Sequence, residues 1–153
     1  MKITKSSNNL IELIKEFEGF SAVPYICPAG VCTIAYGSTR YSDGRKVSMT
    51  DNRITVEAGV QLLKQTLTQY ELAVDAYCRD DINQNQFDAL VDFAYNCGNG
   101  NLKSSTLLKK VNANPNDPTI AAEFARWNKG GNKVLAGLTR RRAAEYKLYS
   151  KPC

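Results

Sequence analysis

Apolar side chains recur with helical spacing near the start of the chain, from Leu10 to Phe17. Positions three and four residues apart lie on one face of an α-helix, so this segment predicts an amphipathic helix. Ser7 or Asn8 is suited to cap its first turn, because a short polar side chain accepts a hydrogen bond from a free backbone N–H. Gly19 is expected to end the helix, since glycine readily adopts the left-handed conformation that follows helices.

The pattern changes between about residues 20 and 52, where Gly, Pro, Thr, Tyr and Val are frequent. Asp43-Gly44 is typical of a hairpin turn, and Pro28-Ala29-Gly30 is a second turn signal. Short β-prone segments separated by such turns predict a small antiparallel sheet.

A long helix is predicted next, over about residues 55–77, with Thr55 as its cap. Its apolar positions alternate in steps of four and three, which keeps them on one helical face. These positions are Val56, Val60, Leu63, Leu67, Tyr70, Val74 and Tyr77.

The rest of the chain is predicted to be helical. Asn83-x-x-Gln86 resembles a capping box and begins a helix that ends at Gly98. Asp117-Pro118 supplies a cap and a first-turn proline for a helix through Trp127. Two further helices are expected over about residues 105–112 and 138–149.

These elements predict an α+β fold that is mainly helical and forms a single domain over residues 1–153. A small antiparallel β lobe at about 20–52 is joined by the long helix at about 55–77 to a helical lobe at about 80–153. A cleft between the two lobes is the expected place for a ligand. We expect a soluble chain that is not exported by itself, because it has neither a signal-peptide pattern nor a membrane-spanning apolar run.

The composition excludes several kinds of catalytic site, because the chain contains no histidine. Neither a Ser-His-Asp triad nor a Cys-His pair can form, and a zinc site with histidine ligands is excluded as well. Acid–base chemistry must come from carboxylates, thiols, hydroxyls, phenols or lysines.

The positive charge is concentrated near the C-terminus. From Arg126 onward the chain holds eight basic residues and one acidic residue, within a total net charge of +5. Arg140, Arg141 and Arg142 are therefore expected to form a basic patch that faces an anionic partner. A solvated helical face is the alternative, and nucleic acid, anionic lipid and acidic cell-wall polymer all remain possible partners.

One carboxylate of the first helix lies on the wrong side for a solvated group. On a helical wheel Glu12 and Glu16 fall on the polar side, whereas Glu18 falls inside the apolar arc. Burial and the negative end of the helix dipole both favour the protonated form of Glu18, which is the form that a general acid needs. A frayed helix end or a structural ion pair with an arginine would also account for this position.

The chain resembles a known family in several motifs. They are Glu18-Gly19-Phe20, Tyr25, Thr33-Ile34-Ala35-Tyr36-Gly37, Asn85-Gln86-Phe87-Asp88-Ala89-Leu90-Val91, Phe93-Ala94-Tyr95-Asn96 and Gly137-Leu138…Arg141-Arg142…Glu145. In these motifs it is similar to the phage-type lysozymes, the endolysins of glycoside hydrolase family twenty-four. The resemblance covers nearly the whole chain in order and implies the same lysozyme-like fold.

The resemblance implies a muramidase that cuts the β-1,4 bond between N-acetylmuramic acid and N-acetylglucosamine in peptidoglycan. In the family, a catalytic Glu is followed after eight residues by Asp and after five more by Thr. The same spacing gives Glu18, Cys27 and Thr33 here, a Glu-Cys-Thr version that some members carry. The family's Gly-Tyr-Gly is Ala35-Tyr36-Gly37 in this chain.

The implied roles follow from this constellation. Glu18 would protonate the leaving glycosidic oxygen as general acid, and Thr33 would hold the attacking water or the intermediate. Cys27 would either activate water or attack the anomeric carbon, and both need a thiolate. Cys32 is a possible redox partner of Cys27 across the turn; alternatively, it is a small buried strand residue.

The resemblance also implies partners and location. Peptidoglycan glycan strands are the expected substrate, and we expect a monomer without cofactor, metal, nucleic acid or stable membrane insertion. The host cytoplasm would hold the protein until a holin releases it to peptidoglycan in the periplasm. Three alternatives remain: a lytic transglycosylase, a non-catalytic wall-binding module, and a nucleic-acid-binding domain that uses its arginines.

Overall fold

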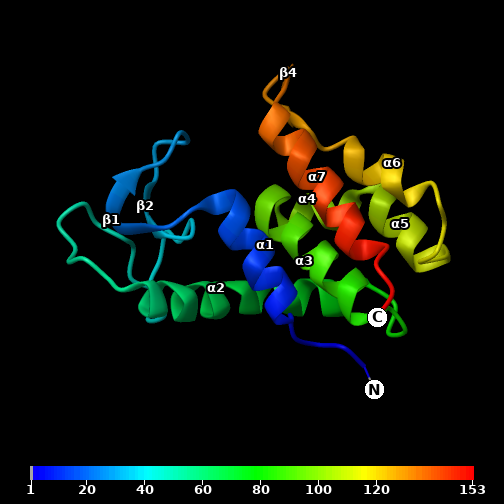
Figure 1. The fold of residues 1–153 in the computed structure, drawn as a ribbon, viewed down its shortest axis with the longest axis horizontal. Helices are drawn as coiled ribbons and strands as arrows, with labels where there is room; N and C mark the ends of the chain where they lie inside the picture. The colour runs from blue at the N-terminus through cyan, green and yellow to red at the C-terminus, as the bar shows by residue number, and fades with distance from the viewer. Residues whose placement is uncertain (1) are drawn as a thin grey trace. The chain divides into compact units, whose positions relative to one another are not determined.

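The computed structural model describes residues 2–153 and is mainly helical, with seven helices and two small antiparallel sheets in that range (Figure 1). In chain order the elements are α1 (Asn8–Glu18), β1 (Ser21–Ile26), β2 (Cys32–Ala35), α2 (Val56–Tyr77), α3 (Gln84–Cys97), α4 (Asn99–Ser104), α5 (Thr106–Ala113), α6 (Ile120–Ala125), β3 (Lys129–Gly130), β4 (Lys133–Val134) and α7 (Ala136–Tyr149). The predicted α+β, mainly helical fold class is therefore confirmed.

The chain forms two compact units. One unit comprises Ile11–Thr68 and contains β1, β2 and the first part of α2. The other comprises Gln69–Cys153, together with the N-terminal residues up to Leu10. No helix in the described part of the chain combines the length and the hydropathy needed to cross a membrane.

The predicted helix caps are present. Ser7 Oγ accepts a hydrogen bond from the Asn9 N–H at 3.2 Å, and Thr55 Oγ1 accepts one from the Ala58 N–H at 3.1 Å. Asn83 and Gln86 form the reciprocal capping box at the start of α3. Each cap satisfies backbone donors that a helix cannot satisfy within itself. The sequence therefore locates the beginnings of α1, α2 and α3 to within a residue.

Three predictions about helices need correction. The helix expected from Asp117 begins at Ile120, because the Asp117 carboxylate accepts from the Thr119 N–H at 2.8 Å and forms a turn there instead. The helix α4 was not predicted. Val56 was placed on the buried stripe of α2 but is 47% exposed, because it lies in the first turn.

The unit Ile11–Thr68 is built around an antiparallel hairpin. Tyr25 in β1 pairs with Thr33 in β2, and Ile26 pairs with Cys32. Beneath the hairpin lies a small core whose buried members are Ile34, Ala35, Val47 and Leu62. The predicted turn at Pro28-Ala29-Gly30 is confirmed, since Gly30 adopts a φ of +80° and its N–H donates to the Cys27 carbonyl at 2.8 Å.

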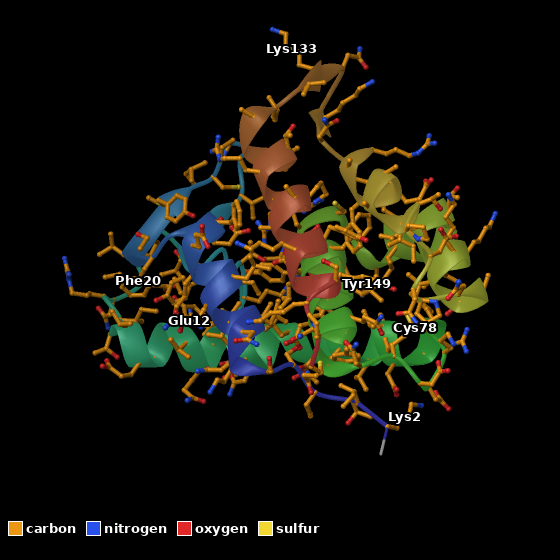
Figure 2. The ribbon with its side chains drawn as sticks, turned by 45° about the vertical axis from the view of Figure 1, so that its right-hand side comes forward. Lys2, Glu12, Phe20, Cys78, Lys133 and Tyr149 are labelled. Carbon is orange, nitrogen blue, oxygen red and sulfur yellow. The ribbon has the colours of Figure 1, made fainter. Side chains whose placement is uncertain are left out.

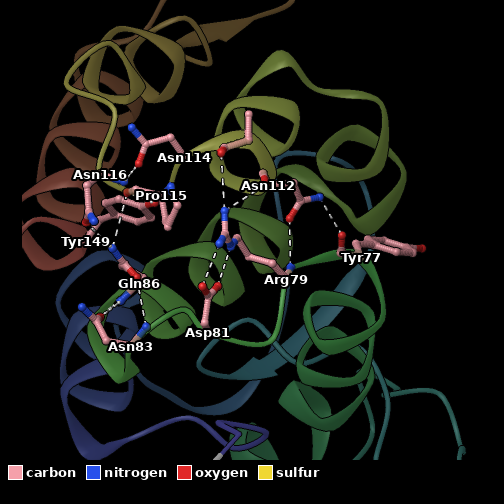
Figure 3. A network of polar contacts seen from close by, with 11 residues as sticks. Tyr77, Arg79, Asp81, Asn83, Gln86, Asn112, Asn114, Pro115, Asn116 and Tyr149 are labelled. Carbon is pink, nitrogen blue, oxygen red and sulfur yellow. Dashed lines mark hydrogen bonds and ion pairs between the residues drawn. The ribbon is translucent and has the colours of Figure 1, made fainter.

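The second unit is held together by α3 and α7, which pack against each other (Figure 1). A polar network ties its connecting segments to the helices (Figure 3). The Asn112 side-chain amide donates to the Tyr77 carbonyl at 2.9 Å and accepts from the Arg79 N–H at 2.9 Å. The Tyr149 hydroxyl donates to the Pro115 carbonyl at 2.6 Å. These bonds connect the segments after α2 and α5 to the neighbouring helices.

A buried ionic cluster lies between α3 and α7. Arg141 donates two hydrogen bonds to the Asp92 carboxylate, at 3.0 and 2.8 Å, and Arg142 Nη2 donates to Glu145 at 2.9 Å. Burial and the negative charge of Asp92 raise the pKa of Glu145 well above its usual range. Hydrogen bonding with Glu145 and Arg141 outweighs the effect of burial on Asp92 and lowers its pKa.

This cluster corrects the predicted basic patch. Arg141 and Arg142 are 4% and 1% exposed, so they face the interior and their charges serve the fold. Arg140 is exposed, as is Lys133 at the β3–β4 hairpin (Figure 2). A count of charges along the sequence does not separate these two environments.

Asp92→Ala should lower the free energy of unfolding by about 3–5 kcal/mol, because it leaves the Arg141 guanidinium buried without its counter-charge. Urea denaturation of the purified variant measures this loss. The exposed control Lys129→Ala should stay within about 0.5 kcal/mol of the unmodified chain. Equal stability of the two variants would show that the buried pair contributes nothing.

Candidate active site

The hairpin β1–β2 positions two of the three predicted site residues. Cys27 follows β1 directly, and its N–H donates to the Val31 carbonyl at 3.0 Å across the turn. Thr33 lies opposite Tyr25 in the paired strands. Because side chains alternate between the two faces of a strand and paired residues share a face, Tyr25, Cys27 and Thr33 all lie on the same face.

The surroundings of Cys27 favour its thiolate. The Val31 backbone, and after it the Thr33 hydroxyl, can stabilise the charged sulfur by hydrogen bonding, and both lower the pKa of Cys27. Hydrogen bonds to a charged form stabilise that form, which is the physical cause of the shift. A thiolate fraction is therefore present at a lower pH than for an ordinary cysteine.

Thr33 has one hydroxyl proton and two acceptors for it. Its Oγ1 donates to the Val31 carbonyl at 2.9 Å, and the Cys27 sulfur is also within hydrogen-bonding reach. The side chain is only 3% exposed, so its position is fixed by packing. Ionisation of Cys27 would draw this proton from the carbonyl to the sulfur, which couples the orientation of Thr33 to the charge of Cys27.

Glu18 is the last residue of α1, and Gly19 turns the chain toward β1 with a φ of +66°. Glu12 and Glu16 are exposed, whereas Glu18 is half-buried. Glu18 is therefore the least exposed of the three carboxylates, as its place inside the apolar arc predicts. It also lies within electrostatic range of the hairpin, as its effect on Tyr25 shows.

Tyr25 connects the two parts of the site. Burial raises the pKa of Tyr25, and the negative charges of Glu18 and Cys27 raise it further. The phenol therefore lies near both groups and stays protonated, so it is available as a hydrogen-bond donor. From the sequence, Tyr25 is identified only as part of a family motif, although its spacing of two residues from Cys27 on a strand is the signal for a shared face.

Cys32 does not lie beside Cys27. It pairs with Ile26, so its side chain occupies the opposite face of the hairpin and packs with the core around Ile34. Both cysteines are free thiols. A disulfide between them would require the strand register to slip, so the geometry favours the structural alternative for Cys32.

Comparisons with known proteins identify the family of this chain. The model of one protein family, described as phage lysozyme, matches residues 15–145. The chain belongs to the phage lysozyme family. It is 42% identical to the endolysin of Bacillus phage B103 over 91% of this chain and 51% of that protein. The chain thus spans about half the length of this relative.

Solved structures of similar length show the same fold. An endolysin from Escherichia coli O157:H7 phage FAHEc1 is 34% identical, with a TM-score of 0.87 over 96% of this chain and 94% of its own. The muramidase domain of SpmX from Asticaccaulis excentricus is also 34% identical, with a TM-score of 0.82 over 97% and 99% of the two chains. These neighbours confirm the lysozyme-like fold of this phage lysozyme family member.

The alkylation rate of Cys27 should follow a thiolate titration centred below that of the same cysteine in the unfolded chain. Only the thiolate reacts, and the folded turn stabilises it. Iodoacetamide labelling across a pH series, read by peptide mass spectrometry, measures this midpoint. Thr33→Val should move the midpoint upward, because the variant lacks the hydroxyl that can turn to the sulfur and stabilise the thiolate.

Cys78 provides an internal control for this experiment. Burial, aided by the charge of Asp75, raises the pKa of Cys78 to about 12, so it should stay unlabelled in the folded chain. A midpoint for Cys27 that does not change on unfolding, with Cys78 protected only in the folded chain, would contradict the assigned hydrogen bonds.

Proposed function

We propose that this chain is a muramidase that hydrolyses the β-1,4 bond between N-acetylmuramic acid and N-acetylglucosamine in peptidoglycan, as an endolysin. The proposal is supported by the presence of Glu18, Cys27 and Thr33 within one compact unit at the family's spacing, with Cys27 and Thr33 on one face of the hairpin. Its relatives are described as endolysins and, in one case, as a muramidase domain.

In the proposed mechanism Glu18 donates its proton to the glycosidic oxygen as the bond to the anomeric carbon breaks. Cys27 acts as thiolate, by one of two routes. It accepts a proton from water, whose oxygen attacks the anomeric carbon, or its sulfur attacks that carbon and water later displaces it. The lowered pKa of Cys27 supports either route.

Thr33 and Tyr25 complete the proposed site. The Thr33 hydroxyl, held between the Val31 carbonyl and the Cys27 sulfur, orients the water or the intermediate. The Tyr25 phenol keeps its proton because burial and the two neighbouring charges disfavour its ionisation. The site needs no metal or cofactor for these steps, so EDTA should leave the activity unchanged.

Glu18→Gln should lower the rate of lysis at least a hundredfold, because general acid catalysis contributes roughly 10²–10⁴-fold. Loss of turbidity of permeabilised Gram-negative cells measures the rate. Unchanged lysis by Glu18→Gln would remove the proposed acid. Binding to the wall without lysis by the unmodified chain would instead indicate a wall-binding module.

Cys27→Ser should lose most of the activity, whereas Cys27→Asp should keep a substantial part, because a carboxylate can act as base and a serine hydroxyl cannot. Turnover on purified peptidoglycan compares the two variants at matched stability. Equal activity of Cys27→Ser and the unmodified chain would show that the thiol is dispensable.

The released fragments distinguish the two routes. Direct attack by water inverts the anomeric configuration, whereas a covalent intermediate on sulfur retains it, and NMR of fresh product reads the anomer. Mass spectrometry should find a reducing end on every fragment. Fragments lighter by one water would identify a lytic transglycosylase and overturn the hydrolytic proposal.

We also propose that the chain accumulates in the host cytoplasm as a monomer and reaches the peptidoglycan only after a holin forms pores in the membrane. Membership of the endolysin family supports this. Expression in the cytoplasm should leave bacterial cells intact until a pore-forming agent is added, and turbidity then falls. Lysis without any such agent would contradict holin dependence.

A further inference from the structure

A pocket of about 350 Å³ lies beside the turn that carries Cys27, and no residue of the proposed site lines it. Its walls include the turn residues Gly30–Cys32 on one side and Thr39, Arg40 and Lys46 on the other. Pockets that bind small molecules begin at about 300 Å³, so this one is large enough for more than a single ion.

Arg40 and Lys46 face each other across an isolated antiparallel bridge. The Tyr41 N–H donates to the Arg45 carbonyl and the Val47 N–H donates to the Thr39 carbonyl, so these bonds flank the bridge on both sides. Arg40 and Lys46 are therefore a non-hydrogen-bonded pair, in which opposing side chains come closest. Two like charges at such a position repel each other, so an anion between them is stabilising. The exposed Arg40 guanidinium donates from Nη1 to the Gly44 carbonyl at 2.8 Å, which leaves its other N–H groups for a ligand.

The acidic side chains near Arg40 and Lys46 already interact with other residues. Arg45 lies over the ring of Tyr41 and forms an ion pair with Asp51 at 3.1 Å, and Asp51 also accepts from the Tyr41 hydroxyl. The Asp43 carboxylate accepts from the Arg45 N–H. Among the described residues, no acidic side chain forms an ion pair with Arg40 or Lys46, and no acidic residue lines the pocket.

We propose that this pocket binds an oxyanion of the cell wall, a carboxylate or phosphate group held between Arg40 and Lys46. The inference rests on the proposed function, because peptidoglycan carries peptide carboxylates beside its glycan. The turn from Cys27 to Val31 connects the pocket to the proposed site. A glycan strand bound at the Cys27 face of the hairpin can therefore reach the pocket on the opposite face with its peptide. The Thr39 hydroxyl supplies a further donor to the bound group.

Direct binding can be measured on the intact chain. We expect muramyl dipeptide, which carries a free carboxylate, to shift the backbone amide NMR signals of Gly30–Cys32 and of the Arg40 and Lys46 segments at constant ionic strength. Inorganic phosphate serves as the second probe and reports whether a phosphate source fits as well. The double variant R40Q/K46Q should weaken binding about five- to tenfold, as expected for two solvent-accessible ion pairs.

The matched control is R53Q/K64Q, which removes the same charge from exposed positions of the same unit. It should bind both probes as the unmodified chain does. Equal weakening in the two double variants would show only general attraction of anions to a cationic protein, and it would overturn the proposal. Failure of both probes to shift these signals would overturn it too.

Lys46→Glu separates binding from folding. A Glu opposite Arg40 replaces repulsion by attraction, so the melting temperature should rise by about 1–3 °C while probe binding is lost. A fall in melting temperature with loss of binding would mean that Lys46 is structural, which contradicts the proposal.

Steady-state kinetics then test whether the pocket binds the peptide part of the substrate. R40Q/K46Q should raise KM for intact peptidoglycan about five- to tenfold and leave kcat and the turnover of peptide-free glycan unchanged, since two ion pairs to the peptide are lost. An equal rise in KM on both substrates would contradict a peptide-binding role. If the unmodified chain cleaves neither substrate, the proposed function fails, whereas the NMR titration still decides whether the pocket binds an oxyanion.

Discussion

The register of the β1–β2 hairpin is the constraint on which the candidate site depends. The pairing of Tyr25 with Thr33 and of Ile26 with Cys32 assigns each side chain to a face. A slip of β2 by one residue would exchange its two faces and place Cys32 or Ile34, instead of Thr33, opposite Tyr25. Two backbone hydrogen bonds between Cys27 and the segment Gly30–Val31 hold the turn in place. Backbone geometry therefore places the Thr33 hydroxyl beside Tyr25 and Cys27 and keeps the Cys32 thiol on the other face.

The electrostatics of the site follow from this placement. Cys27 stands where the family pattern has a carboxylate, and the Val31 N–H and the Thr33 hydroxyl stabilise its negative charge. Burial and the negative charges of Glu18 and Cys27 raise the pKa of Tyr25, so its phenol stays neutral and can donate a hydrogen bond. Hydrogen bonding within the hairpin thus allows the Cys27 thiol, a weaker acid than a carboxyl group, to carry a negative charge at this position.

Much of the fold could be predicted from local sequence. Local signals predict where helices begin and end, as at the caps Thr55 and Asn83 and at Gly19 after α1. These predictions are correct because the interactions involved are between residues that are neighbours in the sequence. The placement of Arg141 and Arg142 could not be predicted, since their burial depends on acids such as Asp92, which lies 49 residues away in the chain. The Asp117 carboxylate can cap a helix or stabilise a turn, and in the structure it stabilises a turn by accepting from the Thr119 N–H.

The site could be predicted from the sequence only where its residues are marked by local patterns. Glu18 stood out on a helical wheel, and the family spacing pointed to Cys27 and Thr33. Tyr25 and the separation of Cys27 from Cys32 depend on cross-strand register, which no local pattern specifies. Ala35 adopts a φ of +59°, a conformation that favours glycine, and glycine is the residue that the family pattern has there. The departure is therefore tolerated at a cost in backbone strain.

The pH dependence of kcat/KM on purified peptidoglycan, compared between the unmodified chain and Cys27→Asp, tests the central claim most directly. If the Cys27 thiolate is the second catalytic group, activity rises with pH as it ionises, and this acid limb lies at higher pH than in Cys27→Asp, because a thiol is a weaker acid than a carboxyl group. Identical acid limbs in the two proteins would show that the group at position 27 does not ionise during catalysis, and the account would be wrong.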